Sequence, residues 1–162
     1  MKAIKTTIID CEMERISEQI RNAEVGRRDA EQEAAAHKGA MASRYDTFKE
    51  EAQYKAAGYA RQIQELDRVL SAFRNLKMNP PAIRKGSIYS IIELKDCDSG
   101  EEKKYFLLPA GGGMVYRVEG EEIAVLTVGS PLALALIGAT PGSLVEAPAE
   151  GTTKSFAVIS VR

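Results

Sequence analysis

Two stripes of apolar and small residues, spaced alternately three and four apart, occupy most of the first half of the chain. The first stripe is Met13, Ile16, Ile20, Ala23, Arg27, Ala30 and Ala34, and the second is Ala52, Ala56, Tyr59, Ile63, Leu66, Leu70 and Phe73. This spacing predicts two helices that pack along their stripes as a coiled coil. The short break between them contains Gly39, a residue type that often ends helices, and therefore favours an antiparallel hairpin.

The stripes carry large residues at their outer ends and alanines toward the break, so we expect the helices to approach closely near the tip. Helices of roughly 30 residues give a hairpin about 45 Å long. Arg27 interrupts its stripe and is expected to extend toward solvent or to pair with an acid of the opposite helix. Ser43 or Thr47 is expected to cap the second helix, Thr47 together with Glu50 in a T-x-x-E capping box.

A double proline separates two halves of different composition. The 79 residues before Pro80 contain three glycines and no proline, whereas the remainder contains all six prolines and ten glycines. Neighbouring prolines cannot continue a helix and hold an extended segment. We therefore predict a helical hairpin over 1–78, a linker over 79–84 and a second domain over 85–162.

The second half alternates apolar, β-branched runs with turn residues. Strands are expected at 87–94, 104–108, 123–127, 143–147 and 154–161. A turn is expected at 98–100, and a short helix over 130–138 with Ser130 as its N-cap and Pro131 in its first turn. The expected fold class is α+β: an antiparallel two-helix hairpin followed by a small antiparallel sheet with one short helix. Three apolar residues are expected in the core of the second domain: Leu134, Ile137 and Leu144.

Composition excludes several classes of protein. The net charge is −1, with 22 Lys and Arg against 23 Asp and Glu, which argues against phosphate-neutralising binding to duplex nucleic acid. No apolar run reaches the ~18 residues needed to cross a bilayer. No secretory signal is visible, so we expect a cytoplasmic protein without membrane contact. Cys11 and Cys97 lack further zinc ligands and are expected to be reduced thiols. His37 has no nucleophile at triad spacing, and 110–113 is expected to be a flexible connection.

Two segments of the second half resemble a known family. The segment SPLALALIG at 130–138, followed by Pro-Gly at 141–142, is similar to the SPLGRALLGK…GD segment of the GreA/GreB transcript cleavage factors. The segment DSGEEKKY at 98–105 is similar to their D…TGE…Y hairpin. The resemblance implies an FKBP-like C-terminal domain that docks on bacterial RNA polymerase, and a helical hairpin that enters the secondary channel of the polymerase.

The hairpin tip of this family carries a motif like D-x-x-E-N-A-E-Y. Matching Ala52 and Tyr54 to the alanine and tyrosine of the motif places Glu50 on its glutamate. Thr47 then takes the place of its aspartate, and Asp46 lies one residue earlier. The present sequence therefore departs from the family pattern, because its two acids are four residues apart and not three.

The resemblance implies that Asp46, Glu50 and Glu51 assist the polymerase, and that Asp46 and Glu50 face a magnesium ion shared with its active centre. Magnesium takes one or two carboxylates and keeps several waters, so such a tip needs few acids. The aromatic residues expected to shape the tip are Tyr45, Phe48 and Tyr54. By the same resemblance, the chain is a monomer and not itself an enzyme, holds no cofactor of its own, and meets the nascent RNA 3′ end indirectly.

Polymerase docking is expected to involve Ser130, Pro131 and Leu134. Contact with RNA phosphates inside the channel is a further expectation for the basic residues of the distal hairpin, which are Arg27, Arg28, Lys38, Arg44, Lys49 and Lys55. On helix physics alone, the tip acids and these cations are equally a solvated surface, with the acids favoured near a helix N-terminus.

Two other functions remain open. A relative that enters the channel and only modulates or inhibits transcription is favoured by the altered spacing of the acids. A prolyl isomerase of FKBP type is the remote alternative, because such pockets are walled by aromatic residues around an indole and this chain has no Trp.

Overall fold

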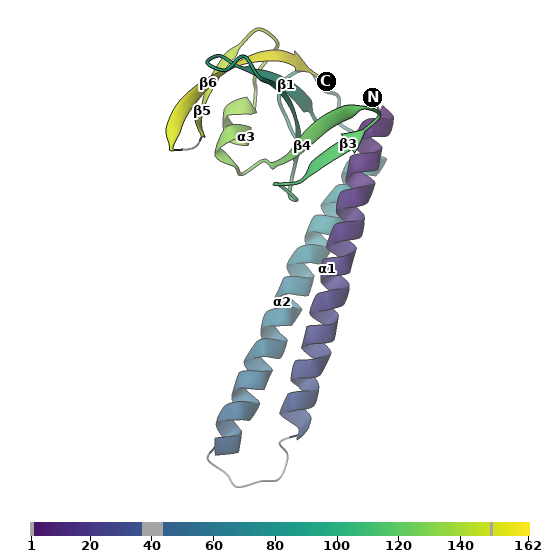
Figure 1. Ribbon diagram of the computed structural model, residues 1–162. Coiled ribbons are helices and arrows are strands. Elements are labelled where there is room, and N and C mark those ends of the chain that lie inside the picture. Colours follow the sequence, from purple (N-terminus) through teal and green to yellow (C-terminus); the bar gives the residue numbers. More distant parts are fainter. Residues whose placement is uncertain (1, 37–43, 150) are drawn as a thin grey trace. The chain divides into compact units, whose positions relative to one another are not determined.

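The computed structural model describes residues 2–36, 44–149 and 151–162 (Figure 1). By their contacts the residues form two compact units, one of Met1–Glu12 with Ala72–Arg162 and the other of Met13–Ser71. In the part of the chain that is described, no helix combines the length and the apolar character needed to span a membrane.

The unit Met13–Ser71 is a helical hairpin. Helices α1 (Lys2–Ala36) and α2 (Arg44–Met78) run side by side in opposite directions, as Figure 1 shows. Buried positions of the predicted stripes in this unit include Ile16, Ala23, Ala30, Ala52 and Leu70. Farther along, Lys55 Nζ lies 3.8 Å from Glu33 Oε2 and links the two helices. The predicted two-helix hairpin is thereby confirmed.

The structure decides two local expectations for the hairpin. The side chain of Arg27 is 41% exposed, and its Nε lies 3.6 Å from Oε1 of Glu31, one turn along the same helix. Of the two alternatives for this arginine, extension toward solvent agrees with the structure, and its ion pair lies within α1. The expectation for Thr47 is wrong. Thr47 lies inside α2 and therefore does not cap it. The other expected cap, Ser43, and the expected helix-ending Gly39 lie outside the described residues.

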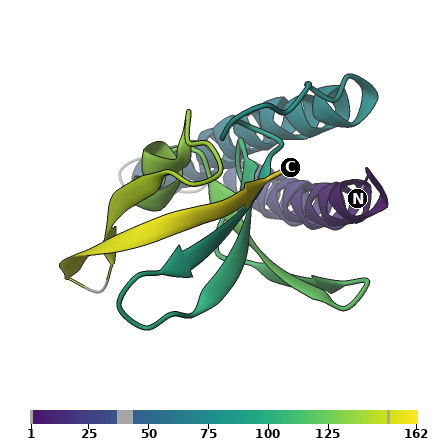
Figure 2. The same cartoon turned by 90° about the horizontal axis from the view of Figure 1, so that it is seen from above.

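The unit that contains the C-terminal half is built on a six-stranded sheet. Its strands are β1 (Ile91–Asp96), β2 (Glu102–Leu108), β3 (Val115–Val118), β4 (Glu121–Thr127), β5 (Leu144–Ala149) and β6 (Thr152–Val161). They lie in the order β3-β4-β2-β1-β6-β5, and Figure 2 shows β6 beside β1. The predicted sheet with one short helix is confirmed, and the short helix is α3 (Pro131–Leu136).

The sheet differs from the expected one in three details. β2 and β4 pair in parallel, while all other neighbours are antiparallel. β3 has only four residues and was not expected from the sequence. The first strand begins at Ile91, because a turn in which Ser90 N donates to Ser87 O precedes it. β5, which forms one edge of the sheet, contains Pro148.

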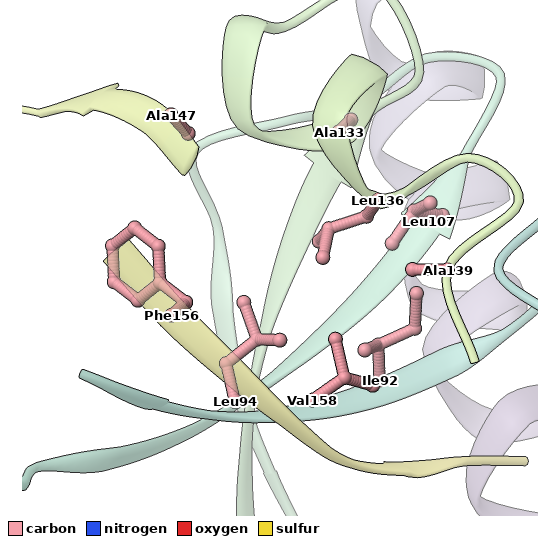
Figure 3. Close-up of a cluster of buried hydrophobic side chains, with 9 residues drawn as sticks. All are labelled: Ile92, Leu94, Leu107, Ala133, Leu136, Ala139, Ala147, Phe156 and Val158. Atoms are coloured by element: carbon pink, nitrogen blue, oxygen red, sulfur yellow. The ribbon is translucent and has the colours of Figure 1, made fainter. Parts of the chain in front are cut away.

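α3 packs on one face of this sheet. Figure 3 shows the buried side chains between them, which are Ile92, Leu94, Leu107, Ala133, Leu136, Ala139, Ala147, Phe156 and Val158. Ser130 caps α3, its hydroxyl accepting a hydrogen bond from the backbone N–H of Ala133. α3 has six residues, and two of them are buried, Ala133 and Leu136. They are three positions apart and so share the face of the helix that meets the sheet.

The expectation that Leu134, Ile137 and Leu144 belong to the core is wrong. Their exposed fractions are 61%, 48% and 72%. Leu134 lies one residue after the buried Ala133, and adjacent helical residues do not share a face. Leu144 begins β5, an edge strand of the sheet. The three side chains therefore form apolar surface.

Gly86 joins the segment before β1 to the end of α3. Its N–H donates to Ala139 O at 2.7 Å, and its carbonyl accepts from Gly138 N at 2.7 Å. A Cβ at position 86 would lie 1.8 Å from the carbonyl oxygen of Leu136. Only glycine lets the two segments approach this closely.

We expect Gly86→Ala to lower the free energy of unfolding by about 2–3 kcal/mol, because a backbone atom must move to admit the methyl group. Gly58→Ala is the matched control, since a Cβ there meets nothing within 4 Å in α2. This control is expected to stabilise by about 1 kcal/mol through helix propensity. Urea unfolding of both variants is the measurement, and equal effects would contradict the close approach.

The start of α1 belongs to the same unit as the sheet. Lys5 Nζ donates to Tyr89 O at 2.9 Å and lies 4.6 Å from the centre of the Tyr89 ring. Glu12, fully buried, accepts from the Tyr116 hydroxyl at 2.7 Å. Burial of Lys5, together with the charge of Arg162, lowers its pKa from 10.5 to about 8. Tyr89 itself has a φ of 74°, an unusual value for a bulky residue.

The lowered pKa of Lys5 predicts that stability rises with pH above about 8. Between pH 8 and 10.5 the unfolded chain holds a proton on Lys5 that the folded chain has released, so the free energy of unfolding increases with pH. The slope is at most about 1.4 kcal/mol per pH unit. Burial raises the pKa of Tyr89, which has the opposite effect above pH 10. Urea titrations from pH 7.5 to about 9.5 test the slope, which Lys5→Met removes and the exposed control Lys85→Met retains.

Candidate functional site

The acids expected at the hairpin tip lie at the start of α2. This helix begins at Arg44, so positions 46, 50 and 51 fall within its first two turns. Glu50 and Glu51 are exposed, and no ion pair among the described residues involves either. The side chains of Asp46 and Tyr45 lie outside the described part. Positions 46 and 50 are both helical and about one turn apart, so they lie on the same side of α2.

A shallow hollow lies beside Glu50 on the surface of α2. Its volume is about 340 Å³, and its lining residues are Glu50, Gln53, Tyr54 and Ala57. The ring of Tyr54 is 75% exposed, and that of Phe48, two residues before Glu50, is 51% exposed. The described aromatic residues near the tip are therefore at the surface, in reach of a partner.

The carboxylates fit magnesium only as part of a shared site. Hard carboxylate oxygens are the ligands that magnesium prefers, and it needs one or two of them. The described residues contain no group of three or more acids, cysteines or histidines placed to hold a metal ion. Asp46 and Glu50 would thus supply part of a coordination shell that another molecule completes.

The cations expected to meet RNA are partly compensated where they are described. Lys55 pairs with Glu33, and Arg27 pairs with Glu31. Lys49 is half-buried on α2, and Arg28 is exposed on α1. Pairs at such exposed positions are weak and exchange readily with other anions. The described part of the distal hairpin therefore carries charges of both signs.

The residues expected to dock on a partner lie on and beside α3. Pro131 is exposed in its first turn, and Leu134 extends into solvent next to it. Ile137 is also exposed, and we call Pro131, Leu134 and Ile137 the α3 apolar surface. Sequence reasoning assigned two of these residues, Leu134 and Ile137, to the core. The short length of α3 is the feature that, once known, excludes them from it. Leu144 is exposed as well, but it precedes Val145, which packs against the core under α3, so its side chain faces the other side of the sheet.

A second hollow lies between α3 and the sheet. It has a volume of about 290 Å³, and its apolar lining includes Tyr105, Leu132 and Phe156. Asp96 lines its rim, and the backbone N–H groups of Ser99 and Asp98 donate to that carboxylate, which lowers its pKa. These bonds hold the β1–β2 turn. With two aromatic residues in its lining, the hollow offers no specific support for a prolyl isomerase.

Comparison with known proteins shows the family. The transcription elongation factor GreA of Paracoccus denitrificans is 32% identical over 130 residues, which cover 76% of this chain and 78% of that protein. GreA of Alkalilimnicola ehrlichii is 30% identical over 136 residues, with the same coverage. Both relatives are transcription elongation factors. The chain belongs to the GreA/GreB family, which confirms the resemblance seen in its segments.

No family model matches the chain. Among solved structures, GreA factor homolog 1 of Thermus thermophilus is similar with 19% identity, a TM-score of 0.40, and coverage of 93% of this chain and 94% of that one. At this TM-score the likeness adds nothing to the assignment, which depends on the curated relatives.

Proposed function

We propose that the protein binds bacterial RNA polymerase at its secondary channel and stimulates cleavage of backtracked RNA. The observation that carries the proposal is the pair of exposed acids at the start of α2 in a member of this family, Glu50 and Glu51, which form no ion pair with another described residue. The polymerase supplies the catalytic centre, and the chain is a monomeric cytoplasmic factor that is not itself an enzyme.

In the proposed reaction, water attacks the phosphorus of an RNA phosphodiester and the bond from phosphorus to the upstream 3′ oxygen breaks. The products are a new 3′-hydroxyl end and a released fragment with a 5′-phosphate. Asp46 and Glu50 would hold a magnesium ion shared with the polymerase, and such an ion would supply charge stabilisation for the attacking and leaving oxygens. Glu51 is the third tip acid proposed to assist the polymerase. The chain needs no cofactor of its own.

The α3 apolar surface is proposed to dock on the polymerase. Leu134 and Ile137 are exposed by 61% and 48%, although exposing such side chains to water costs free energy. Exposed apolar groups at one short helix are typical of a protein interaction surface. With Ser130 held as the cap of α3, the surface keeps a fixed shape.

A channel-binding modulator that does not stimulate cleavage is the second candidate. The observation that favours it is Thr47 at the position of the family aspartate, with the acid moved to position 46. In that case the effect on transcription depends on occupancy of the channel and not on the tip carboxylates.

We expect the wild-type protein to accelerate 3′-end cleavage in a backtracked elongation complex with magnesium. Glu50→Gln and Asp46→Asn are each expected to lower the accelerated rate by about tenfold or more while binding is retained, because each removes one negative ligand. Rates from denaturing gels, with binding measured in parallel, give the answer. Glu65→Gln on α2, far along the helix from the tip, is the matched control.

The outcomes separate the two candidates. Wild-type binding without cleavage, with Glu50→Gln equal to wild type, would establish the modulator. Absence of any binding to the polymerase would contradict both.

Replacing Leu134 by glutamate is expected to weaken polymerase binding by at least about tenfold, because a charge then enters an apolar interface. The exposed position means that the fold tolerates the change, which a thermal melt checks. Ile159→Glu, at another exposed apolar position of the same unit, is the control and should bind as wild type does. Equal affinities of Leu134→Glu and wild type would place docking elsewhere.

A further inference from the structure

Tyr54 is the most exposed aromatic side chain of the described residues, with 75% of its surface open to solvent. Tyrosine is only a moderate helix former, so α2 gains nothing from it at an open position. No aromatic pair or cation–π contact found among the described residues includes it. Its ring is therefore available to a partner.

The surroundings of the Tyr54 ring are small and polar. Ala57, three residues on, ends at its Cβ and leaves space beside the ring, while Gln53 and Glu50 complete the lining of the hollow. A surface for a protein partner would gather larger apolar side chains, whereas besides Tyr54 this hollow offers only the methyl group of Ala57. One flat ring beside an amide suits a planar ligand with hydrogen-bonding edges, and unpaired nucleobases have this chemistry.

Tyr54 also lies one helical turn from Glu50 in α2. An acid that assists hydrolysis and an aromatic platform are thus joined by one rigid element. A nucleotide stacked on the ring would lie in the same hollow of α2 that the Glu50 carboxylate lines. Such positioning would hold the RNA end in one orientation, and orienting a reactant lowers the free energy barrier to reaction.

We propose that the Tyr54 ring is a stacking platform for an unpaired base of the backtracked RNA, with the Gln53 amide facing the edge of that base. The proposal rests on the proposed function, since it requires the hairpin to meet RNA in the polymerase. Tyr54 is a positioning residue in this scheme. Because stacking accepts every base, the platform works on any sequence and favours purines for their larger ring surface.

The test compares Tyr54→Ala, Tyr54→Phe and Tyr54→Leu in factor-dependent cleavage of a backtracked complex. RNA ending in a normal nucleotide is set beside RNA with an abasic one, and the rate without factor is subtracted. We expect Tyr54→Ala to lose about tenfold on normal RNA and nothing further on abasic RNA, where wild type falls to the same rate. Tyr54→Phe is expected to stay within about twofold of wild type, and Tyr54→Leu to behave as Tyr54→Ala. Val25→Ala, which removes another exposed side chain of the hairpin, is the control.

The platform would be overturned if Tyr54→Ala cleaved at the wild-type rate, or if Tyr54→Leu cleaved as fast as Tyr54→Phe. Either result would leave the proposed function intact. If wild type binds but stimulates no cleavage, photocrosslinking from a 3′-terminal 4-thiouridine decides. A crosslink to wild type and Tyr54→Phe that is lost in Tyr54→Ala supports the platform, and no crosslink to wild type overturns it. If wild type does not bind the polymerase, the platform and the proposed function fall together.

Discussion

The seam between α1 and α2 is the constraint on which the rest of the molecule depends. Its buried residues change from Leu70 and Ile16 to Ala23, Ala30 and Ala52 on the way to the tip. Alanines bury little area, so they contribute less free energy per residue than the larger side chains do. Stability is therefore concentrated away from the tip, and the acids lie where small side chains hold the hairpin.

The helical half of the fold could be predicted because its signal is local. A period of three and four is readable residue by residue, and it placed both helices correctly. The sheet depended on pairings between distant segments. β3 has four residues and no apolar run. The parallel pairing of β2 with β4 has no signature in the sequence of either strand. Such features are decided by tertiary packing and not by propensity.

The candidate site likewise has a part that the sequence predicts and a part that depends on tertiary packing. The acids at 50 and 51 were found through a motif, and their exposure in α2 agrees with a role in contact with a partner. The α3 apolar surface was partly missed, because an apolar run such as Leu132–Ile137 reads as core whichever face it presents. Which leucine is buried depends on where a helix of six residues ends, and the run itself does not encode that.

Pro148 limits what the exposed edge of this sheet can pair with. β5 is an edge strand, and it begins with the exposed Leu144. An edge of this kind invites a strand of another molecule, and two copies of the same chain would then join through their sheets. Proline has no amide hydrogen to offer, so it interrupts the row of donors that a further strand requires. Pro148 therefore disfavours the pairing of β5 with the same strand of a second copy of the chain.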